Sequence, residues 1–211
     1  MTSPRVTGSA RRQSQLTRAR ILEAAREQLG RDPDSSLSDI AEAAGVVRRT
    51  VYDHFAGRSA LVEGIVADAA ESLRRALATV TAPGPDAVTA MARFVLALWP
   101  VGDRYRTLLR LTPQDLRAER VNEILAPARD MATAIIEQGQ RQGVFHTSIP
   151  PGPLSRALEG LMLALLECVN AGTYGDDGTR TATAALIAVG ADRDLAVARA
   201  PRLVRPQRVG A

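Results

Sequence analysis

The side chains best suited to chemistry lie in residues 48–55, RRTVYDHF, which carry guanidinium, hydroxyl, carboxylate and imidazole groups. At about 100° per residue along a helix, Val51 and Phe55 share one face with Val47, and His54 lies at its edge. The opposite face is polar, with Arg49 and Asp53 at its centre, Arg48 and Tyr52 on one side and Thr50 on the other. Because guanidinium groups can donate to base edges and hydroxyl groups to phosphates, this face is suited to binding a nucleic acid.

A pair of short helices bent about Gly45 is expected to hold that face in place. Ser36 marks the start of the first helix, because its hydroxyl can accept from the backbone amides of the first turn, and Asp39 stands three residues later. Apolar residues follow at helical spacing to Ala44, and Gly45 tolerates the left-handed conformation that ends a helix. The stretch 37–55, LSDIAEAAGVVRRTVYDHF, therefore predicts a helix-turn-helix.

Two segments of this stretch are specific enough to indicate a family: AEAAGV at 41–46 and RRTVYDHFAGRSAL at 48–61. They resemble the DNA-binding segment of the TetR family of one-component bacterial repressors. The family pattern of Thr, a small apolar residue, Tyr, any residue, His and Phe is filled by Thr50, Val51, Tyr52, His54 and Phe55, and Arg58 replaces the lysine that follows. The resemblance implies an all-α chain, with an N-terminal three-helix DNA-binding domain and a C-terminal helical ligand-binding and dimerisation domain.

The resemblance also implies roles for individual residues. It places the second helix in the major groove, where Thr50, Tyr52, His54 and Arg58 hold phosphates while Arg48 and Arg49 reach bases. Thr17, at the expected start of helix one, resembles a phosphate-contacting position, but a threonine there can equally be only a cap. Asp53 can accept from a cytosine amino group or exclude wrong sites by repulsion, and both readings stay open. The expected DNA-binding set is Thr17, Ser36, Arg48, Arg49, Thr50, Tyr52, Asp53, His54 and Arg58.

Two departures from the family pattern concern how the helices are joined. Val47 stands where the family usually has Ser or Thr, and a valine side chain cannot cap a helix. Either the start of the recognition helix is less well fixed than usual, or another group caps it.

The connection between helix one and helix two is the second departure. Residues 29–36, LGRDPDSS, form a shorter connection than the family usually has, and they lack the Phe and the Gly-Tyr or Gly-Phe pair of the family's connection. The packing of helix one on helix two is therefore expected to differ most from the family.

Composition limits the class of protein. A chain of 211 residues with 45% apolar residues can bury a sizeable core in one or two domains. All 27 basic residues are arginine, and the single Cys168 cannot form an intramolecular disulfide, which fits a reducing cytoplasm. No stretch approaches the roughly 20 apolar residues of a membrane span, and arginines interrupt any secretory pattern at the N-terminus. We expect a cytoplasmic protein with no membrane partner.

Changes of composition predict four regions. Residues 1–14 are small, polar and basic, and are expected to form a flexible arm that either enters a minor groove or is merely solvated. Residues 15–57 form the DNA-binding domain, with helix one starting near Leu16. Residues 58–190 form the helical ligand-binding and dimerisation domain, of which 58–80 is a connecting helix ended by the prolines of 82–85. Residues 191–211 are expected to be a loosely held basic tail, either solvated or adding nonspecific DNA affinity.

Beyond the connecting helix the sequence predicts further helices and no strand. Pro100 is expected to stop the first of them, and Pro127 to kink or split the longest. The expected segments are Asp86–Trp99, Arg104–Leu111, Gln114–Gly143 in two pieces, Leu154–Val169 and Thr181–Val189.

The segment Leu154–Val169 is apolar nearly all round, and a helix of that kind must be buried on all sides. In a domain of this size a partner subunit most simply covers the outer side, which supports a homodimer. The alternative is that these stripes are only intradomain core. The resemblance implies a four-helix bundle built from the last two helices of each chain. The expected interface residues are Leu154, Leu158, Leu161, Leu165, Val169, Ala184, Ile187 and Ala188.

Enzymatic alternatives have little support in the sequence. His54 belongs to the helix-turn-helix, and His146 and Cys168 lie at no metal-ligand spacing, so neither a metal, a cofactor nor a catalytic residue is expected. Two classes remain. One is a homodimeric repressor that binds a palindromic operator in double-stranded DNA and is released by an unknown small-molecule effector. The other is a DNA-binding regulator or architectural protein whose C-terminal half only dimerises or binds another protein. The bulky residues that would line an effector pocket are Met91, Phe94, Trp99, Tyr105, Met131 and Met162.

Overall fold

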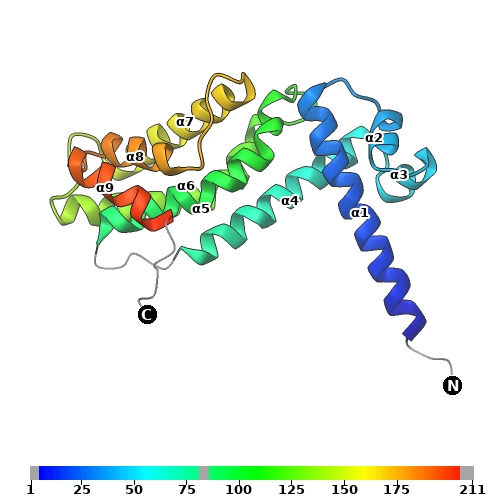
Figure 1. Cartoon of the computed structure of the whole chain (residues 1–211), viewed down its shortest axis with the longest axis horizontal. Helices are drawn as coiled ribbons and strands as arrows, with labels where there is room; N and C mark the ends of the chain where they lie inside the picture. The colour runs from blue at the N-terminus through cyan, green and yellow to red at the C-terminus, as the bar shows by residue number, and fades with distance from the viewer. Residues whose placement is uncertain (1–4, 81–85, 205–211) are drawn as a thin grey trace. The chain divides into compact units, whose positions relative to one another are not determined.

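Helices account for all the regular secondary structure in residues 5–80 and 86–204, which are the residues that the computed structural model describes. In chain order they are α1 (Arg5–Arg31), α2 (Leu37–Ala43), α3 (Arg48–His54), α4 (Arg58–Thr79), α5 (Ala87–Tyr105), the 3-10 helix η1 (Arg106–Arg110), α6 (Ala118–Arg141), α7 (Pro151–Asn170), α8 (Thr179–Ala188) and α9 (Arg193–Val204) (Figure 1). The all-α prediction is confirmed. None of these helices combines the length and the apolar character that crossing a membrane requires.

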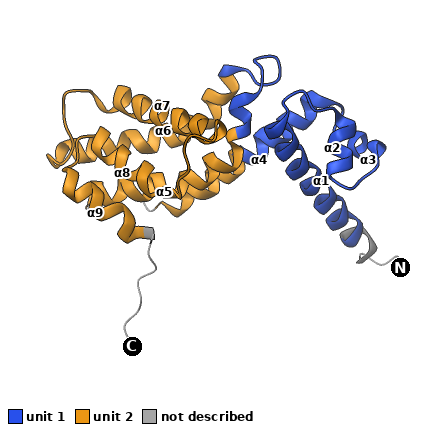
Figure 2. Cartoon of the chain, turned by 45° about the horizontal axis from the view of Figure 1, so that its top comes forward, with its two compact units in different colours: residues 1–69, 107–118 blue, residues 70–106, 119–211 orange. Residues whose placement is uncertain are grey.

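The chain divides into two compact units (Figure 2). Unit 1 joins residues 1–69 to residues 107–118, and unit 2 joins residues 70–106 to residues 119–211. The sequence placed a boundary at residue 57, whereas unit 1 also includes the first half of α4 and a segment from between α5 and α6. Residues 107–118 are therefore part of the unit that holds the helix-turn-helix.

The core of unit 1 is built from one apolar stripe on each of its helices. α1 packs on α2, and α2 packs on α3. The buried side chains are Ile21, Leu22, Ala25 and Leu29 on α1, Ile40 and Ala41 on α2, Val51 and Phe55 on and just after α3, and Leu61, Val62, Ile65 and Val66 on α4. Burying stripes of this kind supplies most of the stability of helices as short as α2 and α3, which would be marginal alone.

The structure corrects the predicted start of α1. The helix already begins at Arg5, so residues 5–14 are not a flexible arm, while residues 1–4 lie outside the described part. Once the packed stripe from Ile21 to Leu29 has nucleated a helix, each added residue forms one more backbone hydrogen bond, which favours extension. Thr17 consequently lies within α1 and cannot cap it.

In unit 2, α5 lies at the centre and packs against α7, α8 and α9. Its buried face includes Met91, Phe94 and Val95, which join the large hydrophobic core of this unit. Contrary to the prediction, Pro100 does not stop α5, which continues to Tyr105. Proline removes one helical hydrogen bond, and burial of Trp99 and Tyr105 on either side holds the helix through that loss.

Two further expectations about unit 2 are wrong. α6 runs as one helix through Pro127 and starts at Ala118, not at Gln114. The predicted loose tail forms α9, in which Ala196 and Ala200 are fully buried against the core. The residues beyond 204 lie outside the described part, as do the prolines of 82–85 that were expected to end the connecting helix.

Candidate nucleic-acid interface

The start of α2 is fixed by a reciprocal pair of hydrogen bonds. The Ser36 hydroxyl accepts from the backbone amides of Ser38 and Asp39, at 3.2 and 3.3 Å, and the Asp39 carboxylate accepts from the Ser36 amide at 2.8 Å. These bonds lower the pKa of Asp39. The predicted capping box is confirmed. The Ser36 oxygen is occupied by this cap, which leaves its hydroxyl hydrogen as the group able to meet a phosphate.

The turn between α2 and α3 depends on Gly45, whose φ of 62° lies in the left-handed region that favours glycine. α3 then begins after Val47, which makes no side-chain cap, as its chemistry predicts. The prediction that Val47 shares the buried face is wrong, because its side chain is 70% exposed. Val47 precedes the helix in extended conformation, and so does not follow helical spacing. Val51 and Phe55 alone anchor this helix in the core.

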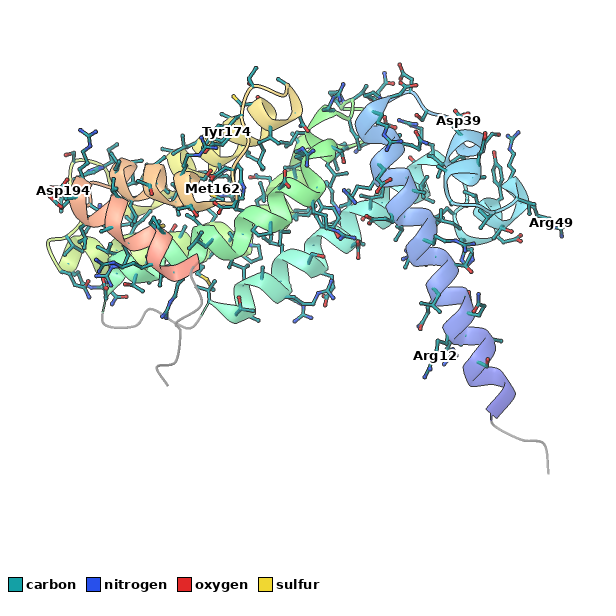
Figure 3. All side chains as sticks on the ribbon, viewed as in Figure 1. Arg12, Asp39, Arg49, Met162, Tyr174 and Asp194 are labelled. Carbon is teal, nitrogen blue, oxygen red and sulfur yellow. The ribbon has the colours of Figure 1, made fainter. Side chains whose placement is uncertain are left out.

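The outward face of α3 carries the predicted polar side chains. Arg48, Arg49, Tyr52 and Asp53 are exposed, while Thr50 and His54 are half-buried. Figure 3 shows Arg49 projecting from the outer edge of α3.

Two neighbouring arginines of this face differ in their surroundings. Arg48 donates to the Tyr52 hydroxyl at 3.1 Å, and its guanidinium lies 5.4 Å from the centre of the Tyr52 ring. Arg49 has no hydrogen bond or ion pair with any residue that the structure describes. Arg49 can therefore donate to a ligand without first breaking a contact, whereas Arg48 and Tyr52 form one preassembled pair.

Arg58, predicted to hold a phosphate in place of the family lysine, is engaged inside unit 1. Its Nε and Nη2 atoms donate to the two carboxylate oxygens of Asp115 at 2.9 and 3.1 Å. Nη1 donates to the carbonyl of Ser35 at 3.0 Å, and Nη2 also donates to the carbonyl of Pro33. The hydrogen bond from Arg58 lowers the pKa of Asp115. These donors join α4 to the α1–α2 connection, so the phosphate contact expected of Arg58 stays a prediction and competes with bonds that the fold already makes.

Sequence reasoning missed a contact between α1 and the end of α3. The Arg18 guanidinium lies 5.0 Å from the centre of the Phe55 ring, a cation–π geometry. Thr17, the preceding residue, is half-buried on the same turn of α1. That turn therefore adjoins the end of the recognition helix, although neither spacing nor residue type indicates the pairing.

The residues expected to line an effector pocket all lie in unit 2, but in different settings. Met91 and Phe94 are core residues, and Met131 and Met162 pack partly buried against that core. The Tyr105 hydroxyl lies 3.1 Å from that of Ser72. Trp99 donates from Nε1 to the carbonyl of Asp176 at 3.0 Å, and its ring meets Tyr174 edge to face. The polar groups of the two large aromatic residues are thus already engaged.

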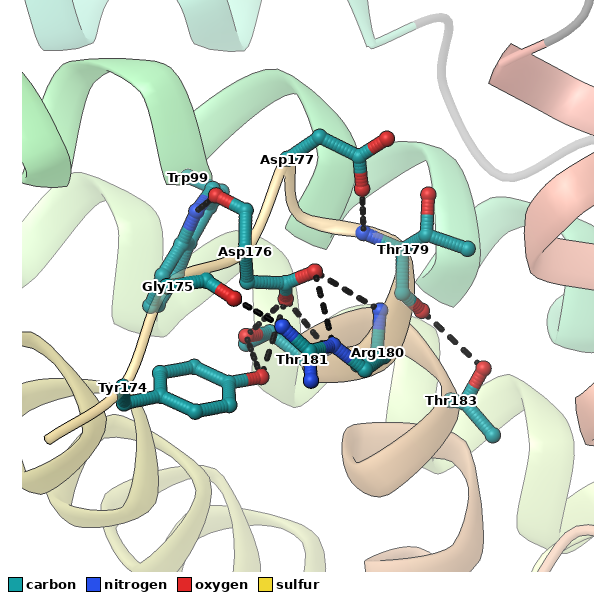
Figure 4. A network of polar contacts seen from close by, with 9 residues as sticks. All are labelled: Trp99, Tyr174, Gly175, Asp176, Asp177, Thr179, Arg180, Thr181 and Thr183. Atoms are coloured by element: carbon teal, nitrogen blue, oxygen red, sulfur yellow. Dashed lines mark hydrogen bonds and ion pairs between the residues drawn. The ribbon is translucent and has the colours of Figure 1, made fainter.

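Trp99 belongs to a polar network that closes the α7–α8 connection (Figure 4). The side chain of Asp176, 2% exposed, accepts from the backbone amide and the hydroxyl of Thr181, both at 2.7 Å, and from the Tyr174 hydroxyl at 3.1 Å. Burial would raise the pKa of Asp176, but the bonds from Thr181 outweigh it and the pKa is lowered. An acidic residue just before a threonine-rich helix start is a capping signal that could have revealed this role.

The predicted dimer residues separate into two groups. Leu154 and Leu158 are 4% and 3% exposed, so they belong to the core of their own chain and are not available to a partner. Leu161, Leu165, Val169 and Ala184 are half-buried, while Ile187 and Ala188 are exposed. Gly160 and Ala164 on α7 are also exposed. These two residues and the six half-buried or exposed ones are here called the α7–α8 face. In residues 5–80 and 86–204, no cluster of three or more His, Cys, Asp or Glu side chains could hold a metal ion.

The domain built by α1 to α4 has a known counterpart. Residues 21–65 match the family model described as bacterial regulatory proteins, tetR family. The chain carries the DNA-binding domain of the TetR family. The matched residues contain the packed half of α1, both helices of the helix-turn-helix and the start of α4, so these helices form the DNA-binding domain of a transcriptional regulator.

Solved structures extend the likeness over most of the chain. A TetR-family transcriptional regulator from Rhodococcus sp. is 20% identical, with a TM-score of 0.66 over 86% of this chain and 99% of that one. NalD of Pseudomonas aeruginosa, the secondary repressor of the MexAB-OprM multidrug efflux pump, is 26% identical, with a TM-score of 0.61 over 86% and 98%. RolR, crystallised with resorcinol, is 23% identical, with a TM-score of 0.57 over 92% and 96%. No curated protein sequence matches this chain.

Proposed function

We propose that this TetR-family protein is a homodimeric repressor that binds a palindromic operator and is released by a small molecule bound in unit 2. The observation that carries the proposal is the outward face of α3. Arg49, at the centre of this face, is exposed and has no partner in the described residues. On the opposite side of the helix, Val51 and Phe55 are buried in the core and hold α3 in place. A rigid helix that presents an uncommitted guanidinium is suited to bidentate recognition of guanine in the major groove.

The α7–α8 face supports the dimer. Ile187 is 46% exposed, and its neighbours on this face are small or apolar. An uncovered apolar surface of this kind is suited to a second copy of the same chain, because a two-fold axis places the same face on both partners. Two recognition helices then read two half-sites about 34–36 Å apart, one turn of the duplex, or a multiple of that distance.

Two observations support release by a small molecule, one from unit 2 and one from a structurally similar protein. RolR was crystallised in complex with resorcinol, and its fold matches most of this chain. In the present chain, Met131 and Met162 are partly buried against the core, and methionine side chains repack readily around a ligand. The second candidate, a regulator without a small-molecule effector, is favoured by Trp99 and Tyr105, whose polar groups already have partners.

Selection of bound DNA tests the first part of the proposal. The full chain is incubated with a random pool of duplexes, and bound sequences are recovered and aligned. We expect an inverted repeat whose half-sites are separated by about one helical turn. Enrichment of single, unpaired half-sites would contradict the dimer, and recovery of no enriched sequence would contradict sequence-specific binding. The enriched duplex then serves as the operator in the experiments below.

Ile187→Glu is expected to raise the dimer dissociation constant on the order of a hundredfold, because like charges juxtaposed in a symmetric interface cost several kcal/mol. Since Ile187 is already half exposed, the monomer should stay folded. Sedimentation at micromolar concentration measures the change. Val197→Glu is the matched control, because Val197 is a 53% exposed apolar residue on α9, outside the α7–α8 face. Equal dimerisation of the two variants would refute the assignment of this face.

Tyr52→Phe is expected to weaken binding to operator and to unrelated DNA alike, by about 0.5–1.5 kcal/mol, the worth of a typical hydrogen bond. The variant keeps the ring beneath Arg48 and removes the hydroxyl assigned to a phosphate. Titration of both duplexes by fluorescence anisotropy measures the effect. A change confined to sequence preference would mean that Tyr52 contacts a base.

A further inference from the structure

The N-terminal half of α1 is a helix with little to pack against. From residue 9 to residue 20 every side chain is exposed except the half-buried Thr17, and Leu16 is 60% exposed. This segment, residues 9–20, is called the α1 extension. Figures 1 and 2 both show α1 projecting beyond α2 and α3. Its charge is of one sign: Arg11, Arg12, Arg18 and Arg20 lie in it, and the first acidic residue of the chain is Glu23.

Local energetics do not favour this arrangement in isolation. The N-terminal end of a helix carries a partial positive charge, so cationic side chains near it are destabilising. Helical segments of this length are marginal in water without packing. Among the described residues, Arg11, Arg12 and Arg20 have no hydrogen bond or ion pair. A nearby row of anions would offset both the repulsion among the arginines and the adverse dipole.

We propose that the α1 extension docks along the phosphate backbone of the operator, outside the half-site read by α3. The inference rests on the proposed function and adds a second DNA-contacting surface to it. Duplex DNA is the fitting partner because its phosphates recur along a line, as the arginines do along the helix. The extension of about 12 residues is roughly 18 Å long, which spans about five base pairs at 3.4 Å each.

The helical form decides the mode of contact. A helix with its side chains is about 10–12 Å across, whereas the minor groove of B-DNA is about 6 Å wide. A flexible arm could enter the minor groove, but a helix is too wide for it. The α1 extension therefore lies against the phosphate backbone. Contacts to phosphates carry no base information directly, so the extension adds affinity without adding sequence preference.

Helical geometry also distinguishes the arginines. Arg11 and Arg18 are seven residues apart, two turns along the same side of α1. Arg18 lies over Phe55 at the end of α3, so Arg11 lies on the side of α1 that faces the recognition helix. Arg12 projects from α1 on the side away from α2 and α3 (Figure 3). Arg11 is thus the contact residue, and Arg12 provides a control with the same charge one position away.

The test uses the full chain and two duplexes that contain the selected operator. The short duplex ends at the outer edges of the two half-sites, and the long duplex has about ten further base pairs on each side. Dissociation constants are measured across a range of salt concentrations for the wild type, Arg11→Gln and Arg12→Gln. We expect the wild type to bind the long duplex on the order of tenfold more tightly. Arg11→Gln should lose several-fold on the long duplex only, with the salt slope reduced by about 2 for the two protomers. Arg12→Gln should stay close to the wild type.

The same three proteins are also titrated with anionic phospholipid vesicles. Three results would overturn the inference: no effect of the flanks in the wild type, equal losses for Arg11→Gln and Arg12→Gln, or a loss for Arg11→Gln that is seen with the vesicles and not with the long duplex. Each can occur while the short duplex is still bound tightly and specifically, in which case the proposed function stands. Failure of the wild type to bind the short duplex would instead contradict the proposed function. Circular dichroism of both variants confirms that helix content is retained.

Discussion

An Arg49→Ala variant is expected to lose discrimination at one base position in each half-site, at a cost of about 1–3 kcal/mol per half-site. The reason is the setting of Arg49 on α3, exposed and with no partner in the described residues, which makes its guanidinium free to bind two acceptors of a guanine. Two half-sites double the effect for the dimer, so it is among the largest expected here. A repeat of the DNA selection with the variant shows which position has become degenerate.

The matched control for Arg49 is Arg193→Ala, which removes the same charge from an exposed position on α9 in unit 2. It should leave both affinity and sequence preference close to those of the wild type. If Arg49→Ala changes neither, the rotation of α3 about its axis differs from the one inferred.

The same selection, made with Asp53→Asn, distinguishes a cytosine contact from repulsion of wrong sites. If Asp53 contacts a cytosine, preference at one position is lost. If Asp53 repels wrong sites, binding to many other sequences rises.

Loss of Arg58 is expected to destabilise unit 1 by about 2–3 kcal/mol, since hydrogen bonds to charged groups contribute about 1.5–3 kcal/mol. Arg58→Ala leaves the Asp115 carboxylate, with a side chain only 18% exposed, without its guanidinium partner. It also removes a donor from the carbonyls of Ser35 and Pro33, just before α2. Hydrogen exchange at α1 and α2 measures the loss, and Arg74→Ala, on an exposed pair of α4, is the control.

Asp115 gives this prediction a second readout, its pH dependence. Arg58 lowers the pKa of Asp115 in the folded chain. A carboxyl whose folded pKa is depressed stabilises the fold above its unfolded pKa, about 3.9, and that contribution is lost as the pH falls through the lowered value. The difference in free energy of unfolding between the wild type and Asp115→Asn should therefore be full at neutral pH and shrink in acid. A difference that stays constant with pH would show that charge is not the cause.

The segment containing Asp115 is fastened to the end of α1 at further points. Arg110 donates from Nη1 to the carbonyl of Gly30 at 2.6 Å, and the Thr107 side chain lies so close to Gly30 that a side chain larger than hydrogen would not fit. The chain leaves unit 2 after α5, makes these contacts within unit 1, and returns to unit 2 at α6. Arg58, the residue at the position of the family lysine, thus supports the fold of the DNA-binding unit.

The helix-turn-helix could be predicted from the sequence because its determinants are local. The Ser36 cap with Asp39, the left-handed turn at Gly45 and the anchors Val51 and Phe55 all act within 20 residues, so spacing and residue chemistry are enough. The same holds for the lack of a cap at Val47. The outward set on α3 follows directly, because a helix whose apolar residues face the core must turn the others to solvent.

What only the tertiary structure decided depends on contacts between residues far apart in the chain. Arg58 meets Asp115, 57 residues later, and no local pattern pairs them. Helix α5 continues through Pro100 because packing on both sides compensates for one lost hydrogen bond, and α9 is held by alanines too small to mark a core stripe. Local propensity sets how each segment can fold, but burial against distant segments contributes more free energy, and it decides where helices end and which charged groups remain free.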